Sequence, residues 1–556
     1  MEKTFLTPFT RRPLAALLLI CVLAWLPGFF TLPPLDRDES RFAQSTKQML
    51  ETGDFININL GTEARYAKPV GIYWLQAAST SLLSGGVWDR IWTYRVPSLL
   101  GATLAVTITF FLARMIGGVE AAFLSGLILG LSVLLMSEAK IAKTDAVLLA
   151  TVVGAQAVLM RAYLCARREG DIAPPSTGLA LLAWAAFGIG ILIKGPLIAL
   201  ICGASILAVS AWDRDWRWLR GLHPLRGFAV ATLIVAPWAV AIAVVSHGAF
   251  YQQSLGQDFA MKLMGDQETH GAPPGYFAAL AHLTFWPGSI ALLPGIVVAI
   301  SRRHEPAIRY LLVWAASTWL MFELAPTKLP HYILPAYPAL AILCSLWLTE
   351  DAWPLSRGEA LFSRVSLAFF ALVGLALAVF VAWAPQRFGD GGTIALYALS
   401  GLGAAAVAAA IPLAIKGRKL DSVAMACVSA VILYYAAGMF AVPRLSALWL
   451  SSRLSDAVAR HVEQSDPAVV TAGYAEPSIT FLLGTRTALD DGTSAGRKAA
   501  ASGGLALVDS TETGPFLSSV SDSGARAEAL EEISGLNYSR GRETRITLYR
   551  VVPRGR

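Results

Sequence analysis

The fold of this chain is decided by residues 14–42, which read LAALLLICVLAWLPGFFTLPPLDRDESRF. The first half is an apolar run that, with its flanks, approaches the length of one bilayer crossing. The second half places three acids and two arginines between Asp36 and Arg41, directly after that run. Ionised groups beside a membrane segment are costly unless they face water or a partner, so they indicate a functional site. A solvated connecting loop is the alternative for the same residues.

The composition indicates a membrane protein. Of the 556 residues, 55% are hydrophobic and 15% are charged, and the mean hydropathy is +0.56. A soluble chain of this length does not need so much apolar surface, so the class is polytopic membrane protein. The net charge of +7 does not indicate nucleic-acid binding, because most basic residues lie in short loops between apolar runs.

The apolar runs predict about thirteen transmembrane helices in an all-helical bundle. We interpret the first run as an uncleaved helix with its N-terminus in the cytoplasm. The predicted spans are 13–32, 91–113, 119–137, 144–164, 178–194, 196–212, 226–247, 278–300, 308–324, 331–349, 362–384, 393–415 and 422–442.

The lysines and arginines predict the orientation of the bundle. From a cytoplasmic N-terminus, the loops on the inner face carry the clusters of Arg and Lys, as the positive-inside rule requires. The outer face then receives residues 36–90, 138–145, Lys194, 247–276 and 325–332. Acids, lysines, histidines and aromatic residues are concentrated in these outer segments, and we expect them to converge on one cavity.

Residues 444–556 differ in character from the membrane domain, residues 1–443, whose long outer loops are 33–90 and 248–277. The apolar patterns of this last part are short and predict a small α/β domain on the outer face. The expected elements are a helix at 451–464, strands at 468–474, 504–508 and 545–551, and helices at 477–483 and 526–533.

Several short motifs follow one another along the membrane domain. They are DESRFA at 38–43, GDF at 53–55, YAKP at 66–69, YW at 73–74, KTD at 143–145 and KLPHYIL at 328–334. In this order they resemble the GT-C membrane glycosyltransferases, most of all the lipid A aminoarabinose transferases, within the wider group of protein O-mannosyltransferase relatives. The resemblance implies a GT-C bundle that moves a sugar from an undecaprenyl-phosphate or similar polyprenyl-phosphate donor to lipid A or a related envelope glycolipid. It also implies an inner-membrane enzyme whose active site and C-terminal domain face the periplasm.

The resemblance also implies roles for single residues. Asp38 matches the catalytic acid of the first loop, and Asp145 matches a second acid of the family. Lys68 and Tyr332 match positions that hold the carrier phosphate. Asp36 lies outside the family pattern.

Cations are expected near the phosphate that leaves, because a site of low dielectric strengthens their effect. Lys262 and His270 match basic positions of the second long loop, and Lys328 with His331 follows on a third outer loop. We expect Lys68, Lys262, Lys328 and Tyr332 to bind the donor phosphate, and Arg41, Tyr66, His270 and His331 to contact the substrate. The alternatives are interfacial lysines that extend toward water and, for Asp145, a helix cap.

No cofactor is assigned from the sequence. Ala67 stands where the family often has a glutamate that can bind a metal, which disfavours a bound divalent metal. The expected partners are the lipid-linked donor, a lipid or glycolipid acceptor and the membrane. The alternative functions are a GT-C transferase that acts on a protein or polysaccharide, and a lipid-linked sugar flippase or transporter. A transporter should show inverted repeats and interrupted helices, which the sequence does not show.

Overall fold

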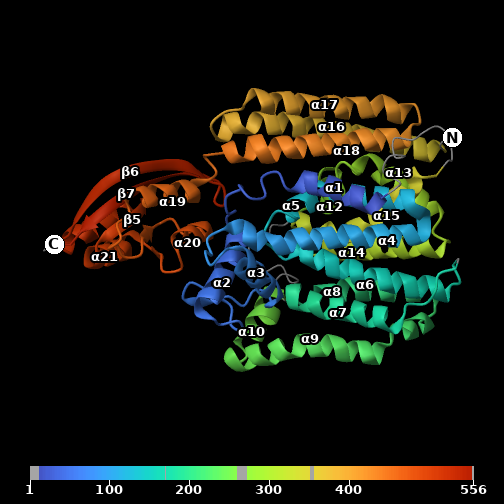
Figure 1. Ribbon diagram of the computed structural model, residues 1–556, viewed down its shortest axis with the longest axis horizontal. Coiled ribbons are helices and arrows are strands. Elements are labelled where there is room, and N and C mark those ends of the chain that lie inside the picture. Colours follow the sequence, from blue (N-terminus) through green and yellow to red (C-terminus); the bar gives the residue numbers. More distant parts are fainter. Residues whose placement is uncertain (1–11, 170, 260–271, 351–355, 554–556) are drawn as a thin grey trace.

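The structure is a computed structural model that describes residues 12–169, 171–259, 272–350 and 356–553. Its helices form an elongated bundle, and a small sheet with its own helices lies at one end of that bundle (Figure 1). We call the end that carries this sheet the sheet end. The opposite end, where Tyr163 and Asp213 lie, is called the far end.

Long apolar segments form helices because a helix pairs its backbone groups internally, as lipid requires. The main helices of the bundle are α1 (Pro13–Trp25), α4 (Ile91–Leu131), α5 (Val133–Glu138), α6 (Asp145–Ala166), α7 (Thr177–Lys194), α8 (Leu197–Asp213), α9 (Pro224–Val245), α12 (Tyr276–Thr284), α13 (Ser289–Ser301), α14 (Pro306–Glu323), α15 (Tyr337–Leu348), α16 (Arg357–Phe388), α17 (Ile394–Ile415) and α18 (Lys419–Ala436). Short helical segments connect them, namely η1 (Arg217–Leu222), α10 (Ala249–Tyr251), η2 (Gln252–Phe259), η3 (Pro330–Ala336), η4 (Ala437–Ala441) and η5 (Val442–Arg444).

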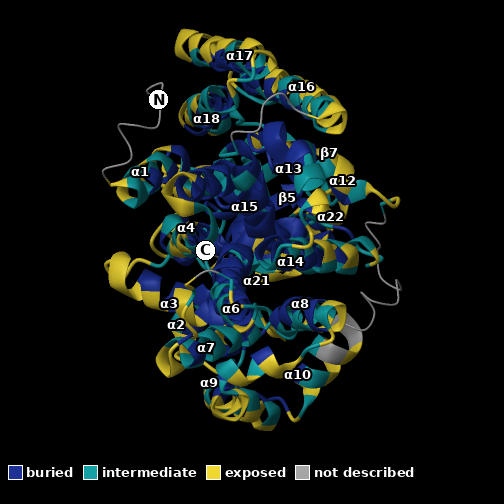
Figure 2. Ribbon diagram, turned by 90° about the vertical axis from the view of Figure 1, so that its right-hand side faces the viewer, coloured by how far each residue is buried: buried dark blue, intermediate teal, exposed yellow. Residues whose placement is uncertain are grey.

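The outer helices of the bundle expose apolar side chains. In α9 only 17% of the most apolar 18-residue window is buried, whereas in α6 the share is 83%. Figure 2 shows the same contrast, with buried helices in the centre and exposed residues on α9, α16 and α17. An apolar surface on helices of this length is suited to lipid, so the chain is a multi-pass membrane protein.

The predicted number of about thirteen transmembrane helices is not confirmed. Within the described residues, eight helices are long and apolar enough to cross a membrane, and the apolar helices α1, α8 and α13 are shorter. The predicted spans 91–113 and 119–137 are joined in α4, which kinks at Gly118. Gly118 has a φ of 77°, which glycine adopts without the steric cost of a Cβ atom. The predicted span 278–300 is divided between α12 and α13.

The first long loop is folded against the bundle. It contains α2 (Asp38–Thr52), the short hairpin of β1 (Asn59–Leu60) and β2 (Glu63–Ala64), and α3 (Gly71–Leu83). The hydroxyl of Thr46 donates to Oε1 of Gln76 at 2.8 Å, so α2 and α3 are joined by a buried hydrogen bond. The loop therefore forms a platform at the sheet end of the bundle.

The C-terminal part forms a five-stranded sheet with the order β4-β3-β5-β7-β6. Strand β3 is parallel to β4 and β5, whereas β7 is antiparallel to β5 and β6. The elements are α19 (Leu450–His461), β3 (Val470–Ala472), α20 (Pro477–Leu483), β4 (Ala488–Asp490), α21 (Gly492–Ser502), β5 (Gly504–Asp509), α22 (Thr513–Asp522), β6 (Arg526–Asn537) and β7 (Arg542–Val552). Helix α20 packs against α2 and so joins the sheet to the first loop.

One predicted element of this part is wrong. Residues 526–533 were expected to form a helix, because they are rich in alanine and glutamate, which favour helices. They belong to β6, which pairs with β7 along its whole length except at an irregularity near Ala529. Pairing with a long neighbouring strand outweighs the local helix propensity, which amounts to only a few tenths of a kcal/mol per residue, about 0.7 at most.

Candidate active site

Helix α2 brings the predicted catalytic acid to the sheet end of the bundle. Asp38 is the first residue of this helix, and its side chain is exposed. The preceding residue, Arg37, has φ 66° and ψ −106°, which a residue with a side chain rarely adopts. Asp38 therefore follows a sharp turn of the chain from the loop into the helix.

Glu39, the neighbour of Asp38, is buried and holds this turn against the bundle. Its two carboxylate oxygens accept hydrogen bonds from Nε and Nη2 of Arg95 in α4, at 2.8 and 2.9 Å. The same oxygens accept from the backbone amides of Leu35 and Ala142, each at 2.9 Å. A buried ion pair is tolerated when its remaining lone pairs are satisfied in this way. Glu39 thus fixes the position of Asp38 relative to α4 and to the segment between α5 and α6.

A buried group of acids and bases lies where α5, α6, α7 and η3 meet. Its centre is Asp145, whose carboxylate lies 2.5 Å from Nζ of Lys194 and 3.8 Å from Nζ of Lys143. Nζ of Lys143 also donates to Glu138 at 3.1 Å. Nε2 of His331 lies 3.9 Å from the Asp145 carboxylate. We call Glu138, Lys143, Asp145, Lys194 and His331 the ionic cluster.

Asp38 and the ionic cluster share one electrostatic environment. Burial lowers the pKa of Lys143, but the nearby carboxylates outweigh this effect and raise its pKa above the ordinary value. Asp38 contributes to this rise together with Glu138 and Asp145. Burial raises the pKa of the Glu138 carboxyl, whereas Lys143 opposes the shift. Lys143 therefore keeps its proton at neutral pH and presents a cation near Asp38.

Two arginines extend the site, Arg41 in α2 and Arg65 directly after β2. Burial and the neighbouring Arg65 lower the pKa of Arg41, and Asp38 opposes this effect. The guanidinium of Arg65 lies 5.3 Å from the centre of the Phe42 ring. The buried Nε of Arg65 and the hydroxyl of Tyr73 have no hydrogen-bond partner in the described part of the chain. Buried polar atoms are nearly always paired, so these two atoms are candidates for contact with a substrate.

An apolar cavity of about 330 Å³ lies next to the ionic cluster. Its walls come from α7, α8, α9, α10 and the segment before α3, and include Leu192, Val235 and Phe250. Lys68 and Lys194 belong to the same lining. Since Lys194 also bonds Asp145, the cavity adjoins the acids. Such a cavity is complementary to a molecule with an apolar chain and an anionic head group.

The two predicted tyrosines each contact a residue that lines this cavity. Nζ of Lys194 lies 5.7 Å from the centre of the Tyr332 ring. Tyr66 packs edge-to-face on Phe250, with 5.7 Å between the ring centres, and its hydroxyl donates to Asn57. Tyr332 is thus adjacent to the ionic cluster, whereas Tyr66 supports the cavity wall.

Lys328, another predicted phosphate contact, bonds residues outside the ionic cluster. Nζ of Lys328 bonds the carboxylate of Glu323 at 2.9 Å, and this carboxylate also accepts from the amide of Gly275. Lys328 would have to leave Glu323 to bind a phosphate. Lys262 and His270 lie outside the described residues.

The described residues of the site do not fit a divalent metal. Ala67 lines the cavity with a methyl group, which offers no ligand atom. The carboxylates of Glu138 and Asp145 are already bonded by lysine ammonium groups, which compete for the oxygens that such a metal needs. Between residues 12 and 553, outside the masked gaps, no three His, Cys, Asp or Glu side chains are grouped as a metal site. We derive no step through a metal.

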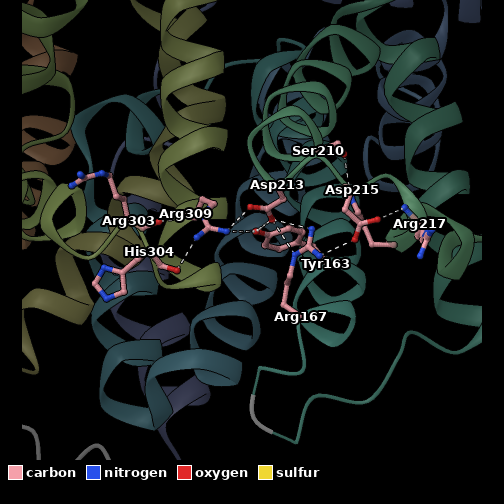
Figure 3. Close-up of polar contacts among 10 residues, drawn as sticks. Tyr163, Arg167, Ser210, Asp213, Asp215, Arg217, Arg303, His304 and Arg309 are labelled. Carbon is pink, nitrogen blue, oxygen red and sulfur yellow. Dashed lines mark hydrogen bonds and ion pairs between the residues drawn. The ribbon is translucent and has the colours of Figure 1, made fainter.

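A second polar cluster lies at the far end of the bundle. Tyr163 stands near the end of α6, about 27 Å from Asp145 at the helical rise of 1.5 Å per residue. One oxygen of Asp213 accepts from Tyr163 at 2.6 Å and from Arg167 at 3.0 Å, and the other accepts from Arg309 at 2.5 Å (Figure 3). These residues come from the ends of α6 and α8 and from α14, so the cluster joins three helices.

Four residues that build the site lie in the predicted outer segments but were assigned no individual role from the sequence: Glu39, Glu138, Lys143 and Lys194. A signal for them was present, because each is an ionisable residue at the edge of an apolar segment. Lys194, for example, ends α7, and α8 begins at Leu197. A lysine in so short a connection needs an acidic partner, but the sequence does not indicate which acid it is.

One protein family and two individual proteins resemble this chain in sequence. The family described as dolichyl-phosphate-mannose-protein mannosyltransferase matches residues 28–249. The undecaprenyl phosphate-alpha-4-amino-4-deoxy-L-arabinose arabinosyl transferase of Pectobacterium atrosepticum is 29% identical over 353 residues, which are 61% of this chain and 60% of that protein. The protein of the same name from Pseudomonas paraeruginosa is 28% identical over 378 residues, 66% of each chain. This chain thus matches less than two thirds of the length of these relatives.

Two solved structures resemble this chain in fold. ArnT from Cupriavidus metallidurans bound to undecaprenyl phosphate matches with a TM-score of 0.75 and 18% identity, over 98% of both chains. The oligosaccharyltransferase of Archaeoglobus fulgidus in the apo form matches with a TM-score of 0.51 and 13% identity, over 91% of this chain and 70% of that chain. At these identities the likeness establishes the fold.

Proposed function

We propose that this chain is a GT-C membrane glycosyltransferase that transfers a sugar from a polyprenyl-phosphate donor to lipid A or a related envelope glycolipid. The observation that carries the proposal is the apolar cavity whose lysines, Lys68 and Lys194, adjoin the ionic cluster. The apolar wall suits an isoprenoid chain, and the ammonium groups suit its phosphate. Relatives named for undecaprenyl phosphate and 4-amino-4-deoxy-L-arabinose support this class of donor.

The proposed reaction exchanges one bond at the anomeric carbon for another. The bond from that carbon to the phosphate oxygen breaks, and a bond to an acceptor oxygen forms. The polyprenyl phosphate leaves with the electron pair, so negative charge grows on its oxygens. Lys194 and Lys143 lie where they can offset this charge, and their effect is strong because both are largely buried. In this proposal Lys68, in the segment before α3 that lines the cavity, contacts the same phosphate.

Asp38 is the proposed catalytic residue. If the acceptor is a hydroxyl, the Asp38 carboxylate takes its proton as a general base. If the acceptor is a phosphate, it is already ionised, and Asp38 instead stabilises the positive charge that develops at the anomeric carbon. Asp145 is bonded by Lys194, so its proposed role is to orient the lysines toward the donor phosphate.

Arg41, His331 and Tyr332 complete the proposed substrate contacts. Arg41 shares the electrostatic environment of Asp38, and His331 adjoins Asp145. Tyr332 lies beside Lys194, so its hydroxyl is suited to the carrier phosphate. The roles expected for Lys262 and His270 stay predictions.

The proposed location is the cytoplasmic membrane, with the site and residues 444–556 facing the periplasm. The distribution of Lys and Arg between alternate loops supports this orientation. Reporter fusions after Lys419 and after Arg460 test it. A periplasmic signal is expected only from the second fusion, and a cytoplasmic signal there would reverse the orientation of the site.

The proposed function is tested with the purified full-length protein and an undecaprenyl-phosphate sugar. We expect mass spectrometry to detect a lipid A species whose mass has increased by one sugar, together with free undecaprenyl phosphate. The same mass difference should be absent from envelope lipids of cells that lack the gene. Movement of the donor across a vesicle membrane without a new glycosidic bond would refute the transferase and favour a flippase.

A further inference from the structure

The C-terminal part contacts the chain immediately before Asp38. The backbone amide of Asp36 donates to the hydroxyl of Tyr538 at 2.6 Å. The hydroxyl of Ser478, in α20, donates to the carboxylate of Asp36. Tyr538 lies in the loop between β6 and β7, so two separate elements of the C-terminal part converge on one residue of the first loop.

Arg37 links these contacts to α2 through a strained backbone. Its φ of 66° and ψ of −106° are retained in a folded protein only where the surroundings hold them. The Arg37 guanidinium donates to the carbonyl of Ser539, in the same loop between β6 and β7. On the other side of Asp38, Glu39 is fixed by Arg95. The turn at residues 36–38, which leads into α2, is therefore held on one side by the C-terminal part and on the other by the bundle.

The contact around Asp36 shields its carboxyl group partly from water, since Asp36 is half-buried and Tyr538 is 36% exposed. Burial raises the pKa of Asp36 to about 6, against the lowering effect of the hydrogen bond from Ser478, and Glu476 raises it further. The carboxyl of an open, solvated loop would keep its ordinary pKa. Asp36 is therefore partly shielded from water where the two parts of the chain meet.

A second set of contacts joins the same two parts farther along α2. The hydroxyl of Thr485 accepts from Nε2 of Gln44 at 2.7 Å and donates to Glu51 at 2.6 Å. Nζ of Lys47 donates to the carbonyl of Phe481 at 3.0 Å. These contacts hold the body of α2 and not its first turn, so they provide a matched control.

We propose that the C-terminal domain positions Asp38 for sugar transfer through Asp36, Ser478 and Tyr538. The inference rests on the proposed function, because it assumes the catalytic role of Asp38. These three are positioning residues that act through the backbone of residues 36–38. When their contacts are lost, Arg37 relaxes and Asp38 moves relative to the ionic cluster, while the cavity that binds the donor is unchanged.

The test compares Tyr538→Phe with Thr485→Ala in the full-length protein. Tyr538→Phe removes only the hydroxyl that the Asp36 amide bonds, and Thr485→Ala removes two side-chain contacts of the second set. We expect Tyr538→Phe to lower kcat about tenfold with the donor KM unchanged, because a displacement of about 1 Å at a catalytic group can cost about a hundredfold. Thr485→Ala should change kcat by less than about twofold. Asp36→Asn, which still accepts from Ser478, should keep more activity than Asp36→Ala.

Hydrogen exchange of residues 36–41 provides a readout that does not depend on activity. We expect faster exchange of these amides in Tyr538→Phe than in Thr485→Ala. Equal losses of kcat in both variants, or unchanged kcat and exchange in Tyr538→Phe, would overturn the positioning role. If the wild-type protein transfers no sugar, the proposed function fails, and the exchange data alone then decide whether the domain holds this turn.

Discussion

The two ends of the helix bundle each hold largely buried acids and bases, but at the sheet end these groups adjoin an apolar cavity. At the far end, both oxygens of Asp213 accept hydrogen bonds, from Tyr163, Arg167 and Arg309. Within the described residues, a buried polar atom lacks a hydrogen-bond partner at each end: Oε2 of Glu138 at the sheet end, and at the far end Nη2 of Arg167, which lies 3.0 Å from Asp213. Asp38 is exposed beside the ionic cluster.

This difference separates a structural cluster from a candidate active site. An ion pair that only joins helices is most stable when its oxygens are all bonded, because each unsatisfied buried atom costs free energy. A site that binds a charged substrate keeps polar atoms unpaired in the free protein. Buried charge and incomplete pairing are therefore common to both ends, and the adjoining apolar cavity distinguishes the sheet end as the candidate site.

The largest expected effect is on catalysis at the sheet end. Asp38→Asn keeps the size of the side chain and removes its charge, so we expect turnover to fall about a hundred- to a thousandfold. The thermal midpoint should not change, because the side chain is exposed. Turnover is measured with the purified donor, and folding by thermal unfolding in detergent. Turnover close to that of the wild type would remove Asp38 from the catalytic role.

Asp213→Asn, at the far end, should have the opposite effects, namely lower stability and unchanged turnover. Two arginines would lose their carboxylate partner, which should lower the free energy of unfolding by about 2–3 kcal/mol in this partly exposed cluster. Turnover per folded molecule should be unchanged. If Asp213→Asn lowers turnover as strongly as Asp38→Asn does, the distinction between the two ends is lost.

Substitutions of two lysines test which cations bind the donor phosphate. Lys68→Ala removes a cation from the cavity lining, so we expect donor binding or turnover to weaken by about 2 kcal/mol. Lys328→Ala instead leaves Glu323 without its partner, so we expect mainly a lower thermal midpoint. Both variants are assayed for donor KM and for unfolding. An equal rise of donor KM in Lys328→Ala would restore this lysine to the phosphate site.

The smallest expected effect is a pH dependence of stability from Asp36. Its folded pKa of about 6 lies above the ordinary value of 3.8, so the folded state binds this proton more tightly than the unfolded state. The contribution of Asp36 to stability is therefore present below about pH 4 and is lost as the pH rises to about 6. Asp36→Asn cannot ionise, so its thermal midpoint relative to the wild type should rise across this range. A difference that is constant with pH would contradict the burial of this carboxyl group.

Local patterns account for much of the fold. Apolar length alone located α9, α16 and α17, because a segment in lipid must pair its backbone internally and a helix does this without any neighbour. The strand β6 was mistaken for a helix, because its conformation depends on pairing with β7. The contacts of Asp36 with the C-terminal part were also missed, because its partners Ser478 and Tyr538 lie 442 and 502 residues away in the chain.

By itself, the sequence determined the membrane class, the positions of most helices and a set of candidate residues that includes Asp38, Asp145 and Lys68. These depend on hydropathy and on motifs, which are properties of neighbouring residues. Only the tertiary structure decided that Lys194 bonds Asp145 and that Arg95 bonds Glu39, across 49 and 56 residues of chain. The physical reason is that a buried charge is stable only beside its partner, and the partner is chosen by how the helices pack.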